Sequence, residues 1–173
     1  INIFKFKATD YYNVPTDKGI IINLKAVGEA ILVHTQDSLY KFTGSNSLMA
    51  TGGEDVAMKE GEPFDTGIQE IFGSRYGFAG LQYKHQHILS ENGYSFYDSD
   101  ANVIYLFNGQ QQMNSISDDI NKLLHYKPVK DIQFASDYYN DRFFIEITFS
   151  DDTFTNLSFN FKSKSLFNKP SQP

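Results

Sequence analysis

The sequence predicts an all-β domain of antiparallel hairpins with one short helix, in a propeller-like or sandwich-like arrangement. Aromatic residues make up 16% of the 173 residues, as 16 Phe and 11 Tyr with no Trp. Phe and Tyr favour the pleated, half-buried surface of a β-strand. Short alternating apolar and polar segments also recur along the chain between clusters of turn residues, and this pattern is typical of hairpins.

The first half of the chain contains four segments with strand character, at 1–7, 19–27, 30–34 and 39–42. Residues 1–7 alternate with the period of two that a half-buried strand shows. A short polar turn joins 30–34 to 39–42, so these two segments form a predicted hairpin. Residues 45–63 are polar and contain glycines, which predicts a long surface loop, and 64–72 fits either a strand or a short helix.

The second half contains six predicted strands, at 85–90, 94–97, 103–107, 131–136, 143–149 and 153–161. One helix is predicted from Ser117 to Leu124. Ser117 is a good N-cap, aspartates in the first turn suit the helix dipole, and Ile120, Leu123 and Leu124 share one face. On 103–107, alternation assigns Tyr105 and Phe107 to the buried face, whereas the preceding turn residues Asp98 and Asp100 are expected to be exposed.

A weak internal repeat supports a propeller-like arrangement. A strand, a polar turn and an aromatic strand ending in glycine occur twice, ending at Gly44 and Gly109. We expect one β-rich domain over 1–173 with repeat units at about 19–63, 64–126 and 127–168. Radially repeated sheets protect their edges, and we expect 1–7 or 153–161 to be an edge strand that a partner covers. The chain begins at Ile1 without Met, so we interpret it as part of a larger protein or assembly.

Composition excludes several functional classes. The formal net charge of −6 argues against tight nucleic-acid binding, which needs Lys and Arg to displace counterions. The absence of Cys excludes disulfides and thiolate metal sites. No apolar run approaches the ~20 residues that cross a bilayer, so no membrane span is expected.

Two groups of segments carry a resemblance to a known family. The first group reads Ser-Arg-Tyr-Gly-Phe at 74–78, Gly-Tyr-Ser-Phe-Tyr-Asp at 93–98, Val-Ile-Tyr-Leu-Phe-Asn-Gly at 103–109 and Ile-Ser at 116–117. The second reads Ala-Ser-Asp-Tyr-Tyr at 135–139, Asp-Arg-Phe-Phe-Ile at 141–145, the alternating run 155–161 and Lys-Ser-Leu-Phe at 164–167.

Together these segments resemble the tail nozzle proteins, also called muzzle or stabilisation proteins, of short-tailed bacteriophages, with the crAss-like phages nearest. The resemblance covers about 19–168. It implies a structural role in the virion, in a propeller-like homo-oligomeric ring around the DNA exit channel, with other tail or virion proteins as partners. The protein would be made in the host cytoplasm and assembled into the phage tail.

Metal sites are possible at two places but are not expected. His85 and His87 are two residues apart, so on a strand they would face the same way and could bind zinc with Asp98 or Glu91. No further spaced ligand is present, which favours ordinary strand histidines. The sequence predicts neither a metal nor another cofactor.

The aspartate-rich turn at 98–102 resembles the start of a calcium loop through Asp98, Asp100 and Asn102. Such a loop needs Gly at its sixth position and Glu at its twelfth, where this chain has Val103 and Gly109. A polar hairpin turn is therefore the favoured interpretation, and the same holds for Asp151 and Asp152.

No catalytic residue is predicted. Asp118 and Asp119 could suggest glycoside hydrolysis, but two acids in the first turn of a helix are explained by its dipole. The chain contains no nucleophile elbow, phosphate loop or zinc-protease motif. None of the four histidines, His34, His85, His87 and His125, lies in a motif that would make it catalytic.

Four tyrosines, Tyr11, Tyr12, Tyr138 and Tyr139, are candidates for a protein or sugar interface, because Tyr buries a large area at little entropic cost. The predicted function is a non-enzymatic tail component that acts by assembly. The alternative is an independent carbohydrate- or receptor-binding β-domain.

Overall fold

The computed structural model describes residues 13–27, 30–43, 68–73, 79–109, 112–116, 118–137, 139–140, 142–160 and 165–169. In these ranges it has twelve strands, one 3-10 helix and one α-helix. The predicted all-β fold with one short helix is therefore confirmed. The predicted strand at 1–7 and the predicted loop at 45–63 lie outside the described residues.

The first group of strands, which we call unit 1, follows a 3-10 helix at Thr16–Lys18. It contains β1 (Ile21–Val27), β2 (Ala30–Thr35), β3 (Leu39–Thr43) and β4 (Ile68–Gly73). Each strand pairs antiparallel with the next. The turn between β2 and β3 is closed by the Thr35 amide, which donates to the Ser38 carbonyl at 2.9 Å. Of the segment 64–72, which fitted either a strand or a helix, residues 68–72 lie in the strand β4, and 64–67 lie outside the described residues.

The second group, unit 2, is another antiparallel meander. It contains β5 (His87–Ser90), β6 (Gly93–Asp98), β7 (Val103–Phe107) and β8 (Gln112–Ser115). A short parallel pairing between β4 and β8 joins units 1 and 2 into one eight-stranded sheet with the order β1-β2-β3-β4-β8-β7-β6-β5. The strand β8 was not predicted.

The third group, unit 3, follows the helix α1 (Asp118–Tyr126). It contains β9 (Val129–Asp137), β10 (Arg142–Phe149), β11 (Phe154–Asn160) and β12 (Ser165–Lys169), in the sheet order β12-β11-β10-β9. The strand β11 pairs on both sides, so 153–161 is not an edge strand. The other candidate, 1–7, lies outside the described residues, so the expectation that at least one of the two is an edge strand stays a prediction. The division into repeat units at 19–63, 64–126 and 127–168 stays a prediction.

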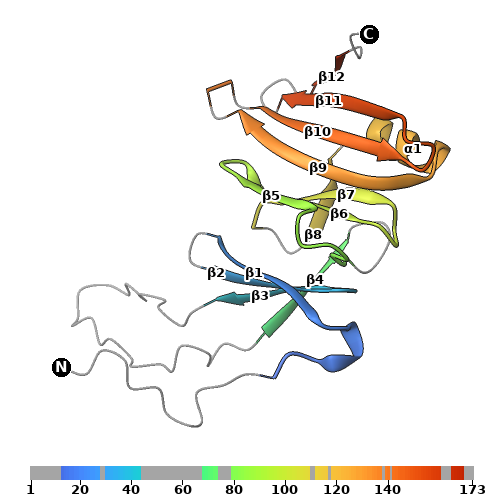
Figure 1. The fold of residues 1–173 in the computed structure, drawn as a ribbon. Helices are drawn as coiled ribbons and strands as arrows, with labels where there is room; N and C mark the ends of the chain where they lie inside the picture. The colour runs from blue at the N-terminus through green and yellow to red at the C-terminus, as the bar shows by residue number, and fades with distance from the viewer. Residues whose placement is uncertain are drawn as a thin grey trace, which may run out of the picture.

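The three units lie in successive layers, with β5–β7 between β1–β3 and β9–β11 (Figure 1). One core lies between units 1 and 2 and contains Leu32, Leu39, Ile71, Ala79, Leu81, Tyr94, Phe96, Val103, Tyr105 and Phe107. A second core lies between unit 2, the helix and unit 3, and contains Tyr97, Ile104, Ile120, Leu124, Ile132, Phe143, Ile145, Ile147, Phe149, Leu157 and Phe159. Unit 2 therefore buries both of its faces.

Strand alternation explains how β7 serves both cores. Val103, Tyr105 and Phe107 point to the first core, and Ile104 points to the second. The predicted burial of Tyr105 and Phe107 is confirmed, because less than 2% of each residue is exposed. Among the described residues, no helix is long and apolar enough to cross a membrane.

Candidate functional site

A buried polar network crosses the interface between units 1 and 2. At its centre is His34 of β2, which ends the apolar run of that strand and is only 1% exposed. Its Nδ1 lies 3.1 Å from the Tyr94 hydroxyl, and its Nε2 lies 3.2 Å from the Ala79 carbonyl oxygen. The ring also meets Phe96 edge-on, with 4.4 Å between centroids. His34 thus joins β2 to β6 and to the segment before β5.

The network continues from Tyr94 towards the surface. The Asn23 amide nitrogen lies 3.3 Å from the Tyr94 hydroxyl and 3.2 Å from His87 Nε2. His87 Nδ1 in turn lies 2.6 Å from the Lys84 carbonyl oxygen. Four side chains from four strands therefore link two backbone carbonyls in an unbroken hydrogen-bonded chain.

Hydrogen-bond partners and burial together determine the protonation state of the two histidines. His87 donates from Nδ1 to the Lys84 carbonyl and accepts at Nε2 from the Asn23 amide, which can only donate, so this ring is neutral. His34 donates from Nε2 to the Ala79 carbonyl, and burial keeps the ring neutral, so that Nδ1 accepts from the Tyr94 hydroxyl. Burial lowers the pKa of His34 to about 3 and also lowers the pKa of His87, while burial raises the pKa of Tyr94 and keeps it a donor. The chemistry of the network is structural, since it contains no carboxylate and no activated nucleophile.

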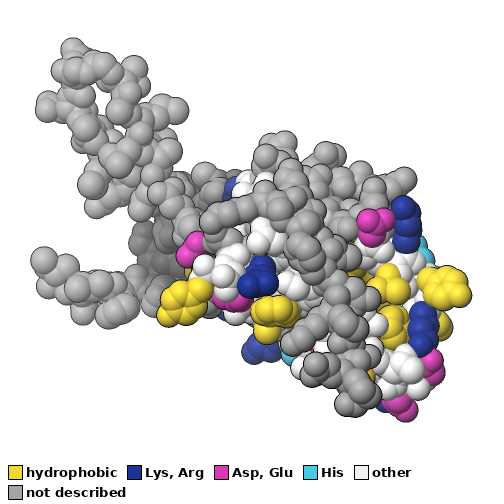
Figure 2. Space-filling view, turned by 90° about the horizontal axis from the view of Figure 1, so that it is seen from above, with side chains coloured by type: hydrophobic (Ala, Val, Ile, Leu, Met, Phe, Trp, Pro, Cys, Tyr) yellow, Lys and Arg dark blue, Asp and Glu magenta, His cyan; other side chains and the backbone are white. Residues whose placement is uncertain are grey.

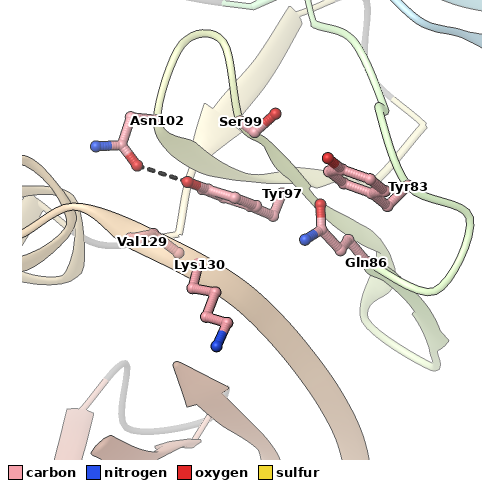
Figure 3. Close-up of a pocket in the computed structure, with 7 residues that line it drawn as sticks. All are labelled: Tyr83, Gln86, Tyr97, Ser99, Asn102, Val129 and Lys130. Carbon is pink, nitrogen blue, oxygen red and sulfur yellow. Dashed lines mark hydrogen bonds between the residues drawn. The ribbon is translucent and has the colours of Figure 1, made fainter. Parts of the chain in front are cut away.

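A pocket of about 270 Å³ lies on the other side of unit 2, towards β9. Its lining consists of Tyr83, Gln86, Tyr97, Ser99, Asn102, Val129 and Lys130 (Figure 3). The Tyr97 hydroxyl donates to Asn102 Oδ1 at 2.6 Å, and Asn102 Nδ2 donates to the Leu124 carbonyl at 2.8 Å. These bonds hold the floor of the pocket between the β6–β7 turn and the helix.

Gln86 is the most unusual group in this pocket. The residue is 1% exposed, and its Nε2 donates to Asp131 Oδ1 at 2.9 Å, whereas its Oε1 has no hydrogen-bond partner. The same Asp131 oxygen lies 2.7 Å from His85 Nε2. Partial burial would raise the pKa of Asp131, but the bonds from His85 and Gln86 outweigh it and lower this pKa. Asp131 thus ties unit 3 to the loop before β5.

The two histidines considered for zinc do not come together. The strand β5 begins only at His87, so His85 lies in the preceding turn and the two side chains do not share a strand face. His85 contacts Asp131, whereas His87 contacts Asn23. Glu91 is exposed in the β5–β6 turn. The described residues contain no group of three or more potential metal ligands.

The expectation that Asp98 is exposed is wrong, because the residue is only 3% exposed. Its Oδ1 accepts from the amides of Asp100 and Ala101, both at 3.0 Å, and its Oδ2 accepts from the Gly80 amide at 2.9 Å. Burial raises the pKa of Asp98 against the effect of these bonds. The carboxylate is buried because it satisfies backbone donors of two segments. Asp100 is exposed, as predicted.

Close packing at Gly80 accompanies this arrangement. A side chain there would place its Cβ 1.9 Å from the Gln36 carbonyl oxygen, so only glycine lets the two backbones approach so closely. The segment around Gly80, whose amide donates to Asp98, therefore packs directly against the β2–β3 turn.

The remaining predicted site residues lie apart from the network and the pocket. Tyr139 is 99% exposed, whereas Tyr11, Tyr12 and Tyr138 lie outside the described residues. Asp119 is exposed and pairs with Lys122 at 3.5 Å, as a solvated helix residue does. Asp151 pairs with Lys127 at 2.6 Å, and this bond chiefly lowers its pKa to about 2.

No known family model and no curated protein matches this sequence. The interpretation of function therefore depends on the geometry of the chain itself. Sequence reasoning missed Asn23, Tyr94, Tyr83 and Gln86. Nothing in the local sequence around these four residues marks them. A signal does exist at His34, because a polar residue at the end of an apolar strand indicates a buried polar partner.

Proposed function

We propose that this chain is a structural component of a bacteriophage tail and acts by protein–protein assembly. In this proposal its stacked β-units form part of a propeller-like ring around the DNA exit channel, with other tail or virion proteins as partners. The observation that carries the proposal is the apolar outer face of unit 1. The family resemblance of the sequence supplies the location in the virion.

The outer face of unit 1 is apolar on three neighbouring strands. Cross-strand pairing places Leu24 opposite Val33, and Val33 opposite Tyr40. The same register places Ile31 opposite Phe42. Val33, Tyr40 and Phe42 form a cluster separate from the two main cores, while Leu24 is 61% exposed and Ile31 is 47% exposed. A sheet with two apolar faces stabilises itself by burying both.

Unit 2 shows how such a sheet is accommodated in this fold, because its two faces are covered by units 1 and 3. On the outer face of unit 1, Val33, Tyr40 and Phe42 are already buried, with Val14 and Ile68 packed against them, whereas Leu24 and Ile31 are exposed. We therefore infer that another unit of the same kind covers the exposed part of this face, around Leu24 and Ile31, and that a second copy of the chain or the longer protein supplies it. Apolar exposure of this kind marks interaction surfaces.

The outer face of unit 3 has a different character. Alternation places Gln133, Glu146 and Asn156 on it, together with Phe144 at 40% exposure and Phe154 at 53% exposure. Figure 2 shows apolar side chains in separate groups between charged and neutral polar ones. The proposed ring requires head-to-tail contact between these unlike faces, because such contacts produce rings when the rotation closes.

The negative net charge of the chain is compatible with a channel wall past which DNA moves without binding to it. A net charge of −6 provides no excess of Lys and Arg for phosphate binding. The proposed role needs no catalytic group, metal or cofactor. The rival role is an independent carbohydrate- or receptor-binding domain.

Quantitative mass spectrometry of gradient-purified phage particles tests this proposal. The chain, or the longer protein that contains it, should occur at a fixed number of copies in tailed particles and be missing from heads without tails. Its absence from purified tailed particles, despite expression in infected cells, would exclude the tail role and favour the independent binding domain.

A further inference from the structure

Two Asn-Gly pairs lie at turns of unit 2, and the proposed assembly uses neither of them. Asn92 ends the β5–β6 turn and Gly93 begins β6, whereas Asn108 and Gly109 directly follow β7. Both asparagines are exposed. Asn-Gly is the dipeptide most prone to spontaneous deamidation, because glycine has no side chain to shield its backbone nitrogen. The two pairs differ in the freedom that the fold leaves to each glycine.

Deamidation of an Asn-Gly pair needs no enzyme, and its only co-reactant is water. The backbone nitrogen of the glycine loses its proton and attacks Cγ of the asparagine, so that a new N–Cγ bond forms. The bond from Cγ to the side-chain nitrogen breaks, and this nitrogen leaves with the proton as ammonia. Water then opens the resulting five-membered succinimide at either carbonyl, which yields aspartate or isoaspartate. Isoaspartate carries one extra carbon in the backbone.

The backbone of Gly93 is held on two sides. This residue pairs with Ser90 of β5, whose hydroxyl donates to the Gly93 carbonyl at 3.2 Å. A Cβ at Gly93 would lie 2.4 Å from the Phe107 carbonyl oxygen, so the end of β7 packs directly against this backbone. The Gly93 nitrogen can therefore turn towards the Asn92 side chain only when the hairpin opens locally, and such opening costs free energy.

The backbone of Gly109 has more freedom. A Cβ at this position would meet no atom of the described residues within 4 Å. The pairings of β7 with its neighbours end before Asn108 in the described part of the chain. The peptide between Asn108 and Gly109 can therefore rotate without breaking a strand pair.

The charges beside the two pairs favour the same site. Negative charge develops at the reacting atoms, because the glycine nitrogen loses its proton as it attacks. Lys41 of β3 places its ammonium nitrogen 3.5 Å from the Gly109 carbonyl oxygen, and a nearby cation stabilises the developing charge. Glu91 directly precedes Asn92 and is exposed, so its carboxylate opposes the same step there.

We propose that Asn108 is a site of spontaneous deamidation in the folded chain and that the β5–β6 hairpin protects Asn92. The modification introduces a negative charge directly after β7 and, in the isoaspartate product, a longer backbone. The proposal is independent of the assembly role, because Asn108 belongs to unit 2, whereas the proposed assembly uses the outer faces of units 1 and 3.

Peptide mapping by mass spectrometry, on the full chain after storage at pH 8, tests this proposal. Aspartate and isoaspartate should accumulate about tenfold or more faster at Asn108 than at Asn92, a ratio that corresponds to about 1.4 kcal/mol between the two barriers. Asn108→Gln is the matched control, because glutamine keeps the amide but would have to form a six-membered ring, which closes far more slowly. This variant should stay unmodified at position 108 and leave the rate at Asn92 unchanged.

The same measurement on the chain unfolded in guanidinium chloride separates the effect of the fold from that of the local sequence. Both pairs then lack the hairpin and the packing against β7, so most of the difference between their rates should disappear. An unmodified Asn108 in the folded chain, equal rates at the two sites in the folded chain, or a tenfold difference that persists after unfolding would overturn the proposal.

Discussion

Asp98 shows how one side chain can organise two segments that are separate in the sequence. Its carboxylate accepts three backbone hydrogen bonds, two within its own turn and one from Gly80. Hydrogen bonds to a charged group each contribute about 1.5–3 kcal/mol. Asp98→Ala should therefore lower the free energy of unfolding by about 3 kcal/mol or more, measured by urea denaturation.

The control for this prediction is Asp100→Ala in the same turn. Asp100 is exposed, and surface substitutions usually change stability by no more than about 0.5 kcal/mol. Equal effects of the two substitutions would mean that Asp98 has no special role.

The His34 network makes stability depend on pH in a specific direction. In the folded state burial lowers the pKa of His34 to about 3, from 6.5, and lowers that of His87 as well. Below pH 6.5 the unfolded chain therefore binds protons that the folded chain does not, so stability falls as pH falls. The slope per such histidine approaches about 1.4 kcal/mol per pH unit.

Urea denaturation at pH 7 and pH 5 checks this dependence. The lowered carboxylate pKa values of Asp131, Asp137 and Asp151 affect stability mainly near and below their unfolded values of about 4. The raised pKa of Asp98 acts in the opposite direction above that value, so a comparison with His34→Phe isolates the contribution of the histidine. His34→Phe should make the decline shallower. A wild-type protein as stable at pH 5 as at pH 7 would contradict the neutral, buried network.

At the scale of elements, β7 is the strand on which both cores depend. Tyr105 and Phe107 pack in the first core and Ile104 in the second. Phe107→Ala should lower the free energy of unfolding by about 3–5 kcal/mol. Phe154→Ala on β11 is the control, since Phe154 is 53% exposed, and it should cost far less. A loss below about 1 kcal/mol for Phe107→Ala would place β7 at the periphery.

Local pattern predicted the elements whose side chains carry a clear period. β10 alternates in burial, β7 is a continuous apolar run between turn residues, and the helix shows its apolar face through Ile120 and Leu124, so all three were expected close to their observed bounds. β8 was missed because Gln112–Ser115 has no apolar alternation, and only pairing with β4 and β7 makes it a strand.

The sites were harder to predict than the strands, because they are made by contacts between distant segments. The burial of Asp98 depends on Gly80, and the burial of His34 depends on Tyr94, which is 60 residues away. The pocket is formed by a loop, a turn and the start of β9. Two histidines separated by one residue indicated a shared strand face, but β5 begins only at the second of them, His87.

At the scale of the whole molecule, the three layers end in unlike faces. The outer face of unit 1 carries exposed Leu24 and Ile31 beside an apolar cluster, whereas the outer face of unit 3 is mostly polar. If copies stack head-to-tail through these faces, charges on unit 1 should prevent stacking without unfolding the chain. We expect Leu24→Glu with Ile31→Glu to keep the melting temperature nearly unchanged, because Leu24 is already 61% exposed and Ile31 47% exposed.

Sedimentation velocity over a wide range of protein concentration tests the assembly role most directly. The account predicts that the wild-type chain associates as its concentration rises, that the Leu24→Glu/Ile31→Glu variant stays monomeric, and that Tyr139→Ala behaves like wild type. A wild-type chain that sediments as a monomer at every concentration would contradict the account and favour a self-contained binding domain.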